Sequence, residues 1–169
     1  MGKEISTLVL GIGNTLLTDE GVGIHVIHHL AETYPDCPNV SFIDGGTLSF
    51  TLASLLAEHQ QLIVVDAARI GGQAGDVTCY EGEAMDRYLT GNRQSVHEVG
   101  LTDLLDIARL SGHYPTARAL VGIEPGGLDW GEEPTPEVAK AVPEAGRLVM
   151  DLIGQWAERD DTPVPSEQG

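Results

Sequence analysis

The sequence predicts a single-domain α/β protein built on a largely parallel β-sheet. Short apolar runs bounded by turn residues alternate with longer runs of helical period, which is typical of β-α-β units. The chain has 169 residues, enough for one domain with its own hydrophobic core. Apolar residues make up 41% of the chain and charged residues only 21%, so a packed globular protein is expected rather than a disordered one.

Five short apolar runs are predicted to form the strands of the sheet. They cover residues 7–12, 40–43, 62–65, 77–80 and 119–123. The second and third runs lead directly into carboxylates, Asp44 and Asp66. The fourth run is short and follows a glycine turn, so we expect it at an edge of the sheet.

Helical periodicity and capping residues predict four helices between and after these strands. They cover residues 20–34, residues 51–59, a segment that starts beside His97 and continues to Ala108, and residues 136–156. Ser95 and Glu98 have the spacing of a capping box, and Thr135 precedes Pro136 as an N-cap precedes a first helical residue. Pro143 is expected to kink or restart the last helix.

The predicted domain covers residues 1–157, and residues 158–169 are expected to form a flexible, acidic C-terminal tail. The 26 acidic and 9 basic residues give a net charge of −17, which argues against a nucleic-acid partner because phosphate binding requires clustered Lys and Arg. No apolar run is long enough to span a membrane, so we expect a cytoplasmic protein without a membrane partner. Cys37 and Cys79 are far apart and predicted to be packing residues.

Polar residues collect at the predicted carboxyl ends of the strands, where open parallel sheets bind their ligands. The loop of residues 11–20 leaves the first strand there, beside Asp44 and Asp66. A carboxylate that ends a run as apolar as residues 62–65 requires a backbone amide, a cation or a proton nearby. This edge is therefore the predicted functional site.

Several common motifs are absent or incomplete. The Gly11-x-Gly13 pair lacks the third glycine of a dinucleotide-binding loop, because Leu16 occupies that position, and acidic residues that would repel phosphate follow. The sequence has no phosphate-binding Gly-x-x-x-x-Gly-Lys loop and no Gly-x-Ser-x-Gly elbow, and His97-Glu98 is not followed by the second histidine of a zinc protease helix.

Other candidate residues are more simply explained by structure. His25, His28 and His29 are predicted on the solvated face of one helix, although His25 and His29 have the i, i+4 spacing of a metal pair. Trp130 is predicted to pack, with a role in covering a cleft as the alternative.

The sequence resembles the [NiFe]-hydrogenase maturation endopeptidases in five segments that appear in the family's order. These segments are residues 8–23, 43–47, 64–67, 95–101 and 121–125. The resemblance covers roughly residues 7–157, and five motifs in register are specific where one would be weak. It implies a three-layer α/β domain in which helices cover both faces of a twisted sheet.

The resemblance also implies a peptidase that removes a short C-terminal extension from a hydrogenase large-subunit precursor after nickel insertion. The family's metal-binding and catalytic positions correspond to Glu20, Asp66 and His97. The segment of Asp44, Gly45, Gly46 and Thr47 matches a family segment that shapes the substrate cleft. The nickel is supplied by the substrate, so the protein itself is expected to be metal-free at rest.

Two carboxylates and an imidazole suit a divalent ion such as nickel or zinc, with cadmium as a further substitute in a crystal, and leave coordination positions open. The ion would polarise the scissile carbonyl or a water, with Glu20 or Asp66 accepting a proton. Alternatively, nickel only docks the substrate and Asp44 acts as the base. Two further alternatives are a non-catalytic nickel-sensing chaperone of the large subunit and an unrelated hydrolase. A monomer is expected.

Overall fold

The protein is a three-layer α/β domain. The computed structural model describes residues 5–46, 52–91, 96–127 and 129–161, with the backbone alone for residues 96–100, 160 and 161. The strands are β1 (Thr7–Ile12), β2 (Val40–Gly46), β3 (Gln61–Ala67), β4 (Val77–Glu81) and β5 (Ala117–Ile123). The helices are the 3₁₀ turn η1 (Thr18–Gly21), α1 (Val22–Thr33), α2 (Leu52–Glu58), α3 (Glu83–Gly91), α4 (Val96–Leu110) and α5 (Pro136–Asp161).

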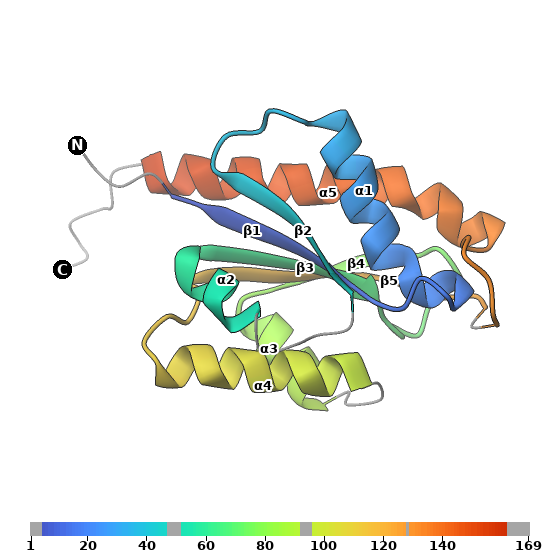
Figure 1. Cartoon of the computed structure of the whole chain (residues 1–169), viewed down its shortest axis with the longest axis horizontal. Coiled ribbons are helices and arrows are strands. Elements are labelled where there is room, and N and C mark those ends of the chain that lie inside the picture. Colours follow the sequence, from blue (N-terminus) through green and yellow to red (C-terminus); the bar gives the residue numbers. More distant parts are fainter. Residues whose placement is uncertain (1–4, 47–51, 92–95, 128, 162–169) are drawn as a thin grey trace.

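The five strands form one twisted sheet in the order β2-β1-β3-β5-β4 (Figure 1). All neighbouring pairs are parallel except β4 with β5, so the edge position predicted for residues 77–80 is confirmed. Helices α1 and α5 cover one face of the sheet, and α2, α3 and α4 cover the other (Figure 1). The predicted α/β fold with helices on both faces is therefore confirmed.

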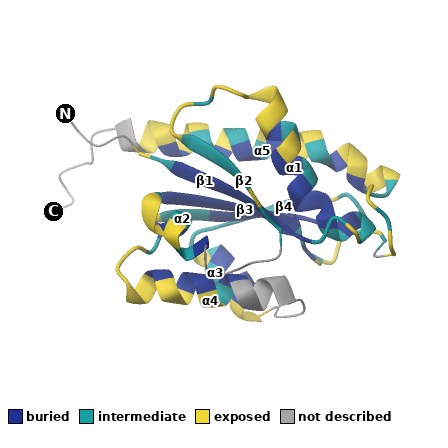
Figure 2. Ribbon diagram, in the orientation of Figure 1, coloured by how far each residue is buried: buried dark blue, intermediate teal, exposed yellow. Residues whose placement is uncertain are grey.

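Two hydrophobic cores lie on either side of the sheet. Strands β1 and β3 occupy its centre and are buried along almost their whole length, which explains why they read as continuous apolar runs (Figure 2). Side chains alternate between the two faces along each strand, so Leu8 and Leu10 pack toward α2 and α4 while Val9 packs toward α1 and α5.

Three details differ from the prediction. Helix α3 was not predicted, because its few apolar positions, Met85, Tyr88 and Leu89, lie in an otherwise polar segment. Helix α5 continues through Pro143 and is not restarted there; Pro143 is exposed, so water can hydrate the carbonyl group that the proline leaves without a donor. The same helix extends to Asp161, whereas the helical period predicted its end at residue 156.

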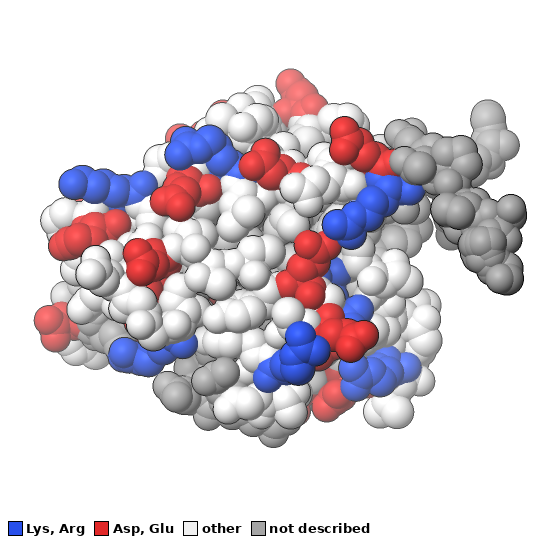
Figure 3. All heavy atoms as spheres, turned by 180° about the vertical axis from the view of Figure 1, so that it is seen from behind, with Lys and Arg blue, Asp and Glu red and all other residues white. Residues whose placement is uncertain are grey.

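Charged side chains of both signs are interspersed on the face seen from behind in Figure 3, and acidic residues accompany most of the basic ones there. In the part of the chain that the structure describes, no helix combines the length and the apolar character needed to cross a membrane.

Both cysteines are free thiols. Cys79 packs against the core on the α1 and α5 face, as predicted, and burial together with the Glu81 carboxylate raises its pKa to about 11. The Cys79 thiol is therefore protonated at neutral pH and unreactive. Cys37 is half-buried in the loop between α1 and β2.

The two tryptophans occupy opposite environments and provide a test of the packing. Trp156 on α5 is 1% exposed and donates a hydrogen bond from Nε1 to Glu81, whereas Trp130 is 80% exposed. We expect Trp156→Ala to lower the free energy of unfolding by about 3–5 kcal/mol. Trp130→Ala should change it by less than about 0.5 kcal/mol. Urea unfolding followed by circular dichroism measures both, and equal effects would contradict the assigned environments.

Candidate active site

The carboxyl ends of β1 and β3 form the topological switch point of the sheet. Strand β1 lies between β2 and β3 in the sheet. The chain that leaves β1 forms α1 on one face of the sheet, whereas the chain that leaves β3 leads to β4 and then to α3 and α4 on the opposite face. Chain segments that leave neighbouring strands toward opposite faces open a crevice between them, and α/β proteins bind ligands there. Glu20 in η1 and Asp66 near the end of β3 both lie at this point.

Asp66 is a buried carboxylate with an exposed fraction of only 3%. Its Oδ1 accepts a hydrogen bond of 2.8 Å from the backbone N–H of Ala67. By strand alternation Asp66 shares the side of β3 that carries Leu62 and Val64, so it faces the layer of α2, α3 and α4. This is the layer whose helix α4 carries His97.

Glu20 is brought to the same place by close backbone packing. Its 3₁₀ turn contacts β3 and is half-buried at Glu20. Gly13 has φ +143° and lies against the carbonyl of Glu20, and a Cβ at Gly23 would lie 2.7 Å from the carbonyl oxygen of Ile12. The glycines of this loop are therefore required for packing η1 and α1 onto the sheet. This close packing, and not phosphate binding, explains the Gly-x-Gly pattern.

His97 belongs to the first turn of α4, and its side chain lies outside the described part of the structure. Figure 1 shows that α4 begins at the same end of the molecule at which β1, β3 and β5 end. Among the described residues, no three His, Cys, Asp or Glu side chains are grouped closely enough to hold a metal ion. That set does not include His97, so the three-ligand site remains a prediction.

The end of β2 contacts the first loop, but its carboxylate, Asp44, is turned away from Asp66. Asp44 Oδ1 accepts the N–H of Gly46 at 2.9 Å, and its Oδ2 lies 3.5 Å from Nε2 of His28 on α1. Asp44 therefore faces the α1 side of the sheet, opposite to the side that Asp66 faces. The carbonyl of Gly46 accepts the N–H of Gly13 at 3.0 Å, whereas Thr47 lies outside the described residues. Gly45 has no room for a Cβ, because Leu10 would lie 2.8 Å from it.

Asp19 is the important residue that sequence reasoning missed. Its side chain has an exposed fraction of 0%. One carboxylate oxygen accepts the N–H groups of Gly126 and Gly127 at 2.7 Å each and the Thr135 hydroxyl at 2.8 Å, and the other accepts the Thr135 N–H at 2.6 Å. The carboxylate next to Glu20 thus ties η1 to the loop after β5 and to the start of α5.

These hydrogen bonds also determine the protonation of Asp19. Burial alone would raise the pKa of Asp19, but the hydrogen bonds from Thr135, Gly127 and Gly126 together outweigh it and lower the pKa. Asp19 is therefore ionised at neutral pH. No local pattern could have found this contact, because Asp19 and Thr135 are 116 residues apart in the chain. The prediction that Thr135 precedes the first turn of α5 is nevertheless confirmed.

Glu124 has an equivalent role on the other side of the site. It is 8% exposed, and its Oε1 accepts the N–H groups of Ile70 at 2.8 Å and Gly72 at 3.2 Å. The loop that follows Asp66 is therefore held against the end of β5. Glu124 lies in residues 121–125, the last of the five segments that resemble the family. Its hydrogen bonds to the loop after β3 explain why a carboxylate is needed at this position.

The helix histidines do not all lie on a solvated face as predicted. His28 is exposed, but Nε2 of His25 is buried and has no hydrogen-bond partner among the described residues. Burial lowers the pKa of His25, and the nearby His28 lowers it further. His29 lies against Gly146 of α5.

The prediction that Trp130 packs is wrong. Its side chain is largely exposed, because its loop pairs by backbone with Leu17 and leaves the indole outside.

The fold and the carboxylates at the switch point define an α/β protein with a ligand site at its strand ends. Comparison with known proteins agrees with this class. The family model described as hydrogenase maturation protease matches residues 24–152. The hydrogenase 2 maturation protease of Escherichia coli is 34% identical over 147 residues, covering 86% of this chain and 89% of that protein. The hydrogenase expression/formation protein HupD of Rhizobium leguminosarum is 34% identical over 150 residues, covering 88% and 74%.

Solved structures give the same result. The hydrogenase maturating endopeptidase HybD from Escherichia coli superimposes with a TM-score of 0.81 at 29% identity, covering 89% of this chain and 93% of that one. The [NiFe] hydrogenase maturation protease HybD from Thermococcus kodakarensis gives a TM-score of 0.75 at 27% identity, covering 88% and 99%. The chain belongs to the hydrogenase maturation protease family and is a peptidase.

The network around Asp19 predicts an acid-sensitive contribution to stability. Asp19→Asn places an amide group against donors that need an acceptor, so we expect a loss of about 3 kcal/mol in the free energy of unfolding at pH 7. Because the folded state lowers the pKa of Asp19, its contribution is complete above about pH 4 and is lost as the pH falls through the lowered value. The difference from the wild type should therefore shrink at pH 3.

Urea unfolding of both proteins at pH 7 and pH 3 checks this expectation. Asp103→Asn, which changes an exposed carboxylate on α4, is the matched control and should have little effect at either pH. An Asp19→Asn protein as stable as the control at pH 7 would contradict the structural role of this carboxylate.

Proposed function

We propose that the protein is an endopeptidase that removes the C-terminal extension of a [NiFe]-hydrogenase large-subunit precursor after nickel has been inserted. The observation that carries the proposal is the family membership, together with Asp66 and the turn that carries Glu20 at the switch point of the sheet. Its substrate is a folded precursor that already holds its metal, so the nickel belongs to the substrate and not to the peptidase.

The proposed nickel ligands are Glu20, Asp66 and His97. Two carboxylates about 4 Å apart repel each other by about 4 kcal/mol at an effective dielectric constant of 20, so a pair built into one crevice favours a cation between them. Asp66 is already buried, and glycine packing fixes the turn that carries Glu20. Oxygen and nitrogen donors suit Ni(II). Recognition of the metal restricts cleavage to precursors that have received it.

Cleavage adds water across one peptide bond and yields a carboxylate and an amine. The substrate-borne ion polarises the scissile carbonyl or the attacking water. Glu20 or Asp66 then accepts the proton from the water and returns it to the leaving amine. Asp44 is a poor candidate for this base, because its carboxylate faces His28 on the opposite side of the sheet from Asp66.

Purified protein mixed with nickel-loaded precursor tests the proposal by intact mass. A peptidase shortens the precursor, whereas a non-catalytic chaperone forms a complex with the full-length precursor, and an unrelated hydrolase does neither. We expect His97→Ala, Glu20→Gln and Asp66→Asn each to reduce the rate of shortening by at least about a hundredfold while the circular dichroism spectrum is unchanged. Precursor without nickel should remain uncut. Full activity of the His97→Ala protein would show that His97 is not part of the active site.

Asp44→Asn separates the two possible bases. If Asp44 only helps to bind substrate, the substitution raises KM and leaves kcat within about threefold of the wild-type value. If Asp44 is the base, kcat falls by about a hundredfold or more. The orientation of Asp44 toward α1 predicts the first outcome, and steady-state kinetics with nickel-loaded precursor measures it.

A further inference from the structure

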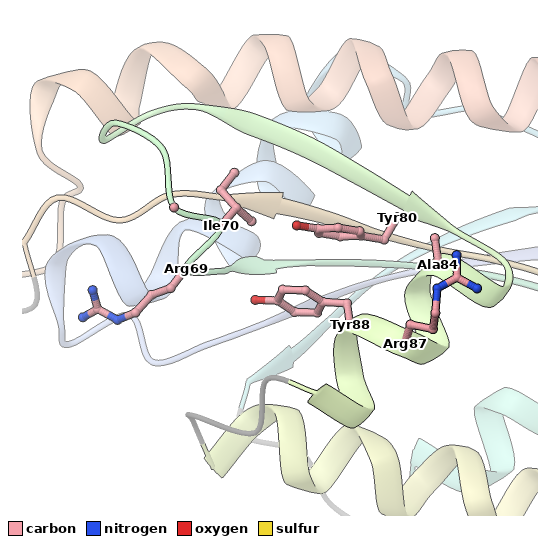
Figure 4. A pocket seen from close by; sticks show the side chains of 7 residues that line it. Arg69, Ile70, Tyr80, Ala84, Arg87 and Tyr88 are labelled. Atoms are coloured by element: carbon pink, nitrogen blue, oxygen red, sulfur yellow. The ribbon is translucent and has the colours of Figure 1, made fainter.

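A cavity lies beside the loop that follows Asp66, on the face covered by α3. It has a volume of about 570 Å³ and is lined by the loop after β3, by β4 and by α3. Its lining side chains include Arg69, Ile70, Tyr80, Ala84, Arg87 and Tyr88 (Figure 4). The family comparison assigns no role to it.

The charged side chains of this cavity are both arginines. Within the described part of the chain, neither Arg69 nor Arg87 forms a salt bridge with a carboxylate, although the protein has a net charge of −17. Three other arginines, Arg109, Arg118 and Arg159, are paired with carboxylates, whereas the exposed Arg147 on α5 has no such partner among the described residues. Two exposed guanidinium groups that are left for a ligand indicate an anion, and arginine prefers carboxylates because its fork of donors matches them.

The two tyrosines provide a rigid surface between the arginines. Tyr80 and Tyr88 are stacked, with ring centroids 4.6 Å apart and an angle of 22° between the planes. Their hydroxyl groups point the same way, toward the end of the cavity at Ile70 (Figure 4). Arg87 lies at the other end beside Ala84, and the Arg69 side chain extends outward from the end at Ile70 (Figure 4). Tyr80 is half-buried, and Tyr88 is 7% exposed and belongs to the core on this side of the sheet, so the pair forms a fixed wall of the cavity.

The loop of the cavity is held in place before any ligand binds. Glu124 accepts the N–H groups of Ile70 and Gly72, and Gly122 of β5 allows Ala68 to approach so closely that a Cβ there would lie 2.8 Å from the Ala68 Cβ. A preformed site loses less conformational entropy when it binds.

The cavity is close enough to the proposed nickel site to hold the same substrate. Arg69 follows Asp66 by three residues, so the two Cα atoms are at most about 10 Å apart. Helix α3, which carries Arg87, is also the element that precedes α4 with His97. An extended substrate bound at Asp66 therefore reaches the cavity within about three residues.

We propose that this cavity binds a carboxylate-bearing part of the precursor's C-terminal extension, with Arg69 and Arg87 at its two ends as the anion-binding residues and the tyrosine pair as its fixed wall. The inference rests on the proposed function, because it identifies which part of that substrate the cavity holds. It makes the two arginines substrate-binding residues, not catalytic ones: they hold the segment that leaves, on the far side of the scissile bond from the nickel.

A binding experiment without nickel or cleavage tests the cavity alone. The probe is a fluorescent peptide with the sequence of the extension, compared with a neutral version in which the terminal carboxylate and the acidic side chains are replaced by amides. We expect the anionic peptide to bind the wild type at least about tenfold more tightly than it binds the Arg69→Gln/Arg87→Gln protein. The neutral peptide should bind both proteins equally weakly, and added salt should weaken only the wild-type interaction with the anionic peptide.

Arg147→Gln is the matched control, because Arg147 is an exposed arginine on α5, on the opposite face of the sheet. It should bind the anionic peptide as the wild type does. Equal affinity of the wild type for both peptides, equal affinity of the wild type and the double variant for the anionic peptide, or an equal loss in Arg147→Gln overturns the proposal.

Kinetics with nickel-loaded precursor provide a second measurement. The double variant should raise KM about tenfold or more and leave kcat within about twofold of the wild type. An unchanged KM contradicts the proposal. If the wild type binds the anionic peptide through its arginines but never shortens the precursor, the proposed function fails and the anion-binding cavity stands. If the precursor is shortened but the peptide result is negative, the cavity proposal fails alone.

Discussion

The arrangement of the site depends on one buried carboxylate that takes no part in the proposed chemistry. Asp19 gathers hydrogen bonds from Gly126, Gly127 and Thr135 and so joins the turn after β1, the loop after β5 and the start of α5. These three segments come from distant parts of the chain. Because Glu20 is the next residue, the position of one proposed nickel ligand is determined by a network whose other members lie more than 100 residues away.

Glycine packing and Glu124 complete this framework. The close approach of Gly13 and Gly23 to neighbouring backbone holds η1 and α1 on the sheet, while Glu124 holds the loop after β3. Buried acids therefore have two different roles at the carboxyl edge. Asp19 and Glu124 accept backbone N–H groups and stabilise loops, whereas Asp66 lies near the end of a central strand, where we propose a nickel ligand. Composition alone does not distinguish these roles.

The fold was predictable from sequence because its central strands, β1, β3 and β5, are short apolar runs. Residues 7–12 were predicted as a strand with the bounds that the structure gives, since both faces of β1 are buried and every position is apolar or small. Helix α3 was not predictable in the same way, because only one narrow side of it is apolar. The site was predictable in part: strand ends placed Asp66, but the Asp19 network and the orientation of Asp44 depend on contacts between distant segments, which periodicity does not contain.

The exposure of Trp130 gives the protein an internal optical reporter. Of its two indole groups, one is sealed inside the domain and the other stands in water, in a loop that pairs by backbone with Leu17 of the segment leading to Glu20. A macromolecule that covers this segment dehydrates only the outer indole. The fluorescence emission of Trp130 would then move to shorter wavelength, while the emission of Trp156 stays constant. Binding of the macromolecule can therefore be followed in real time without attaching a dye.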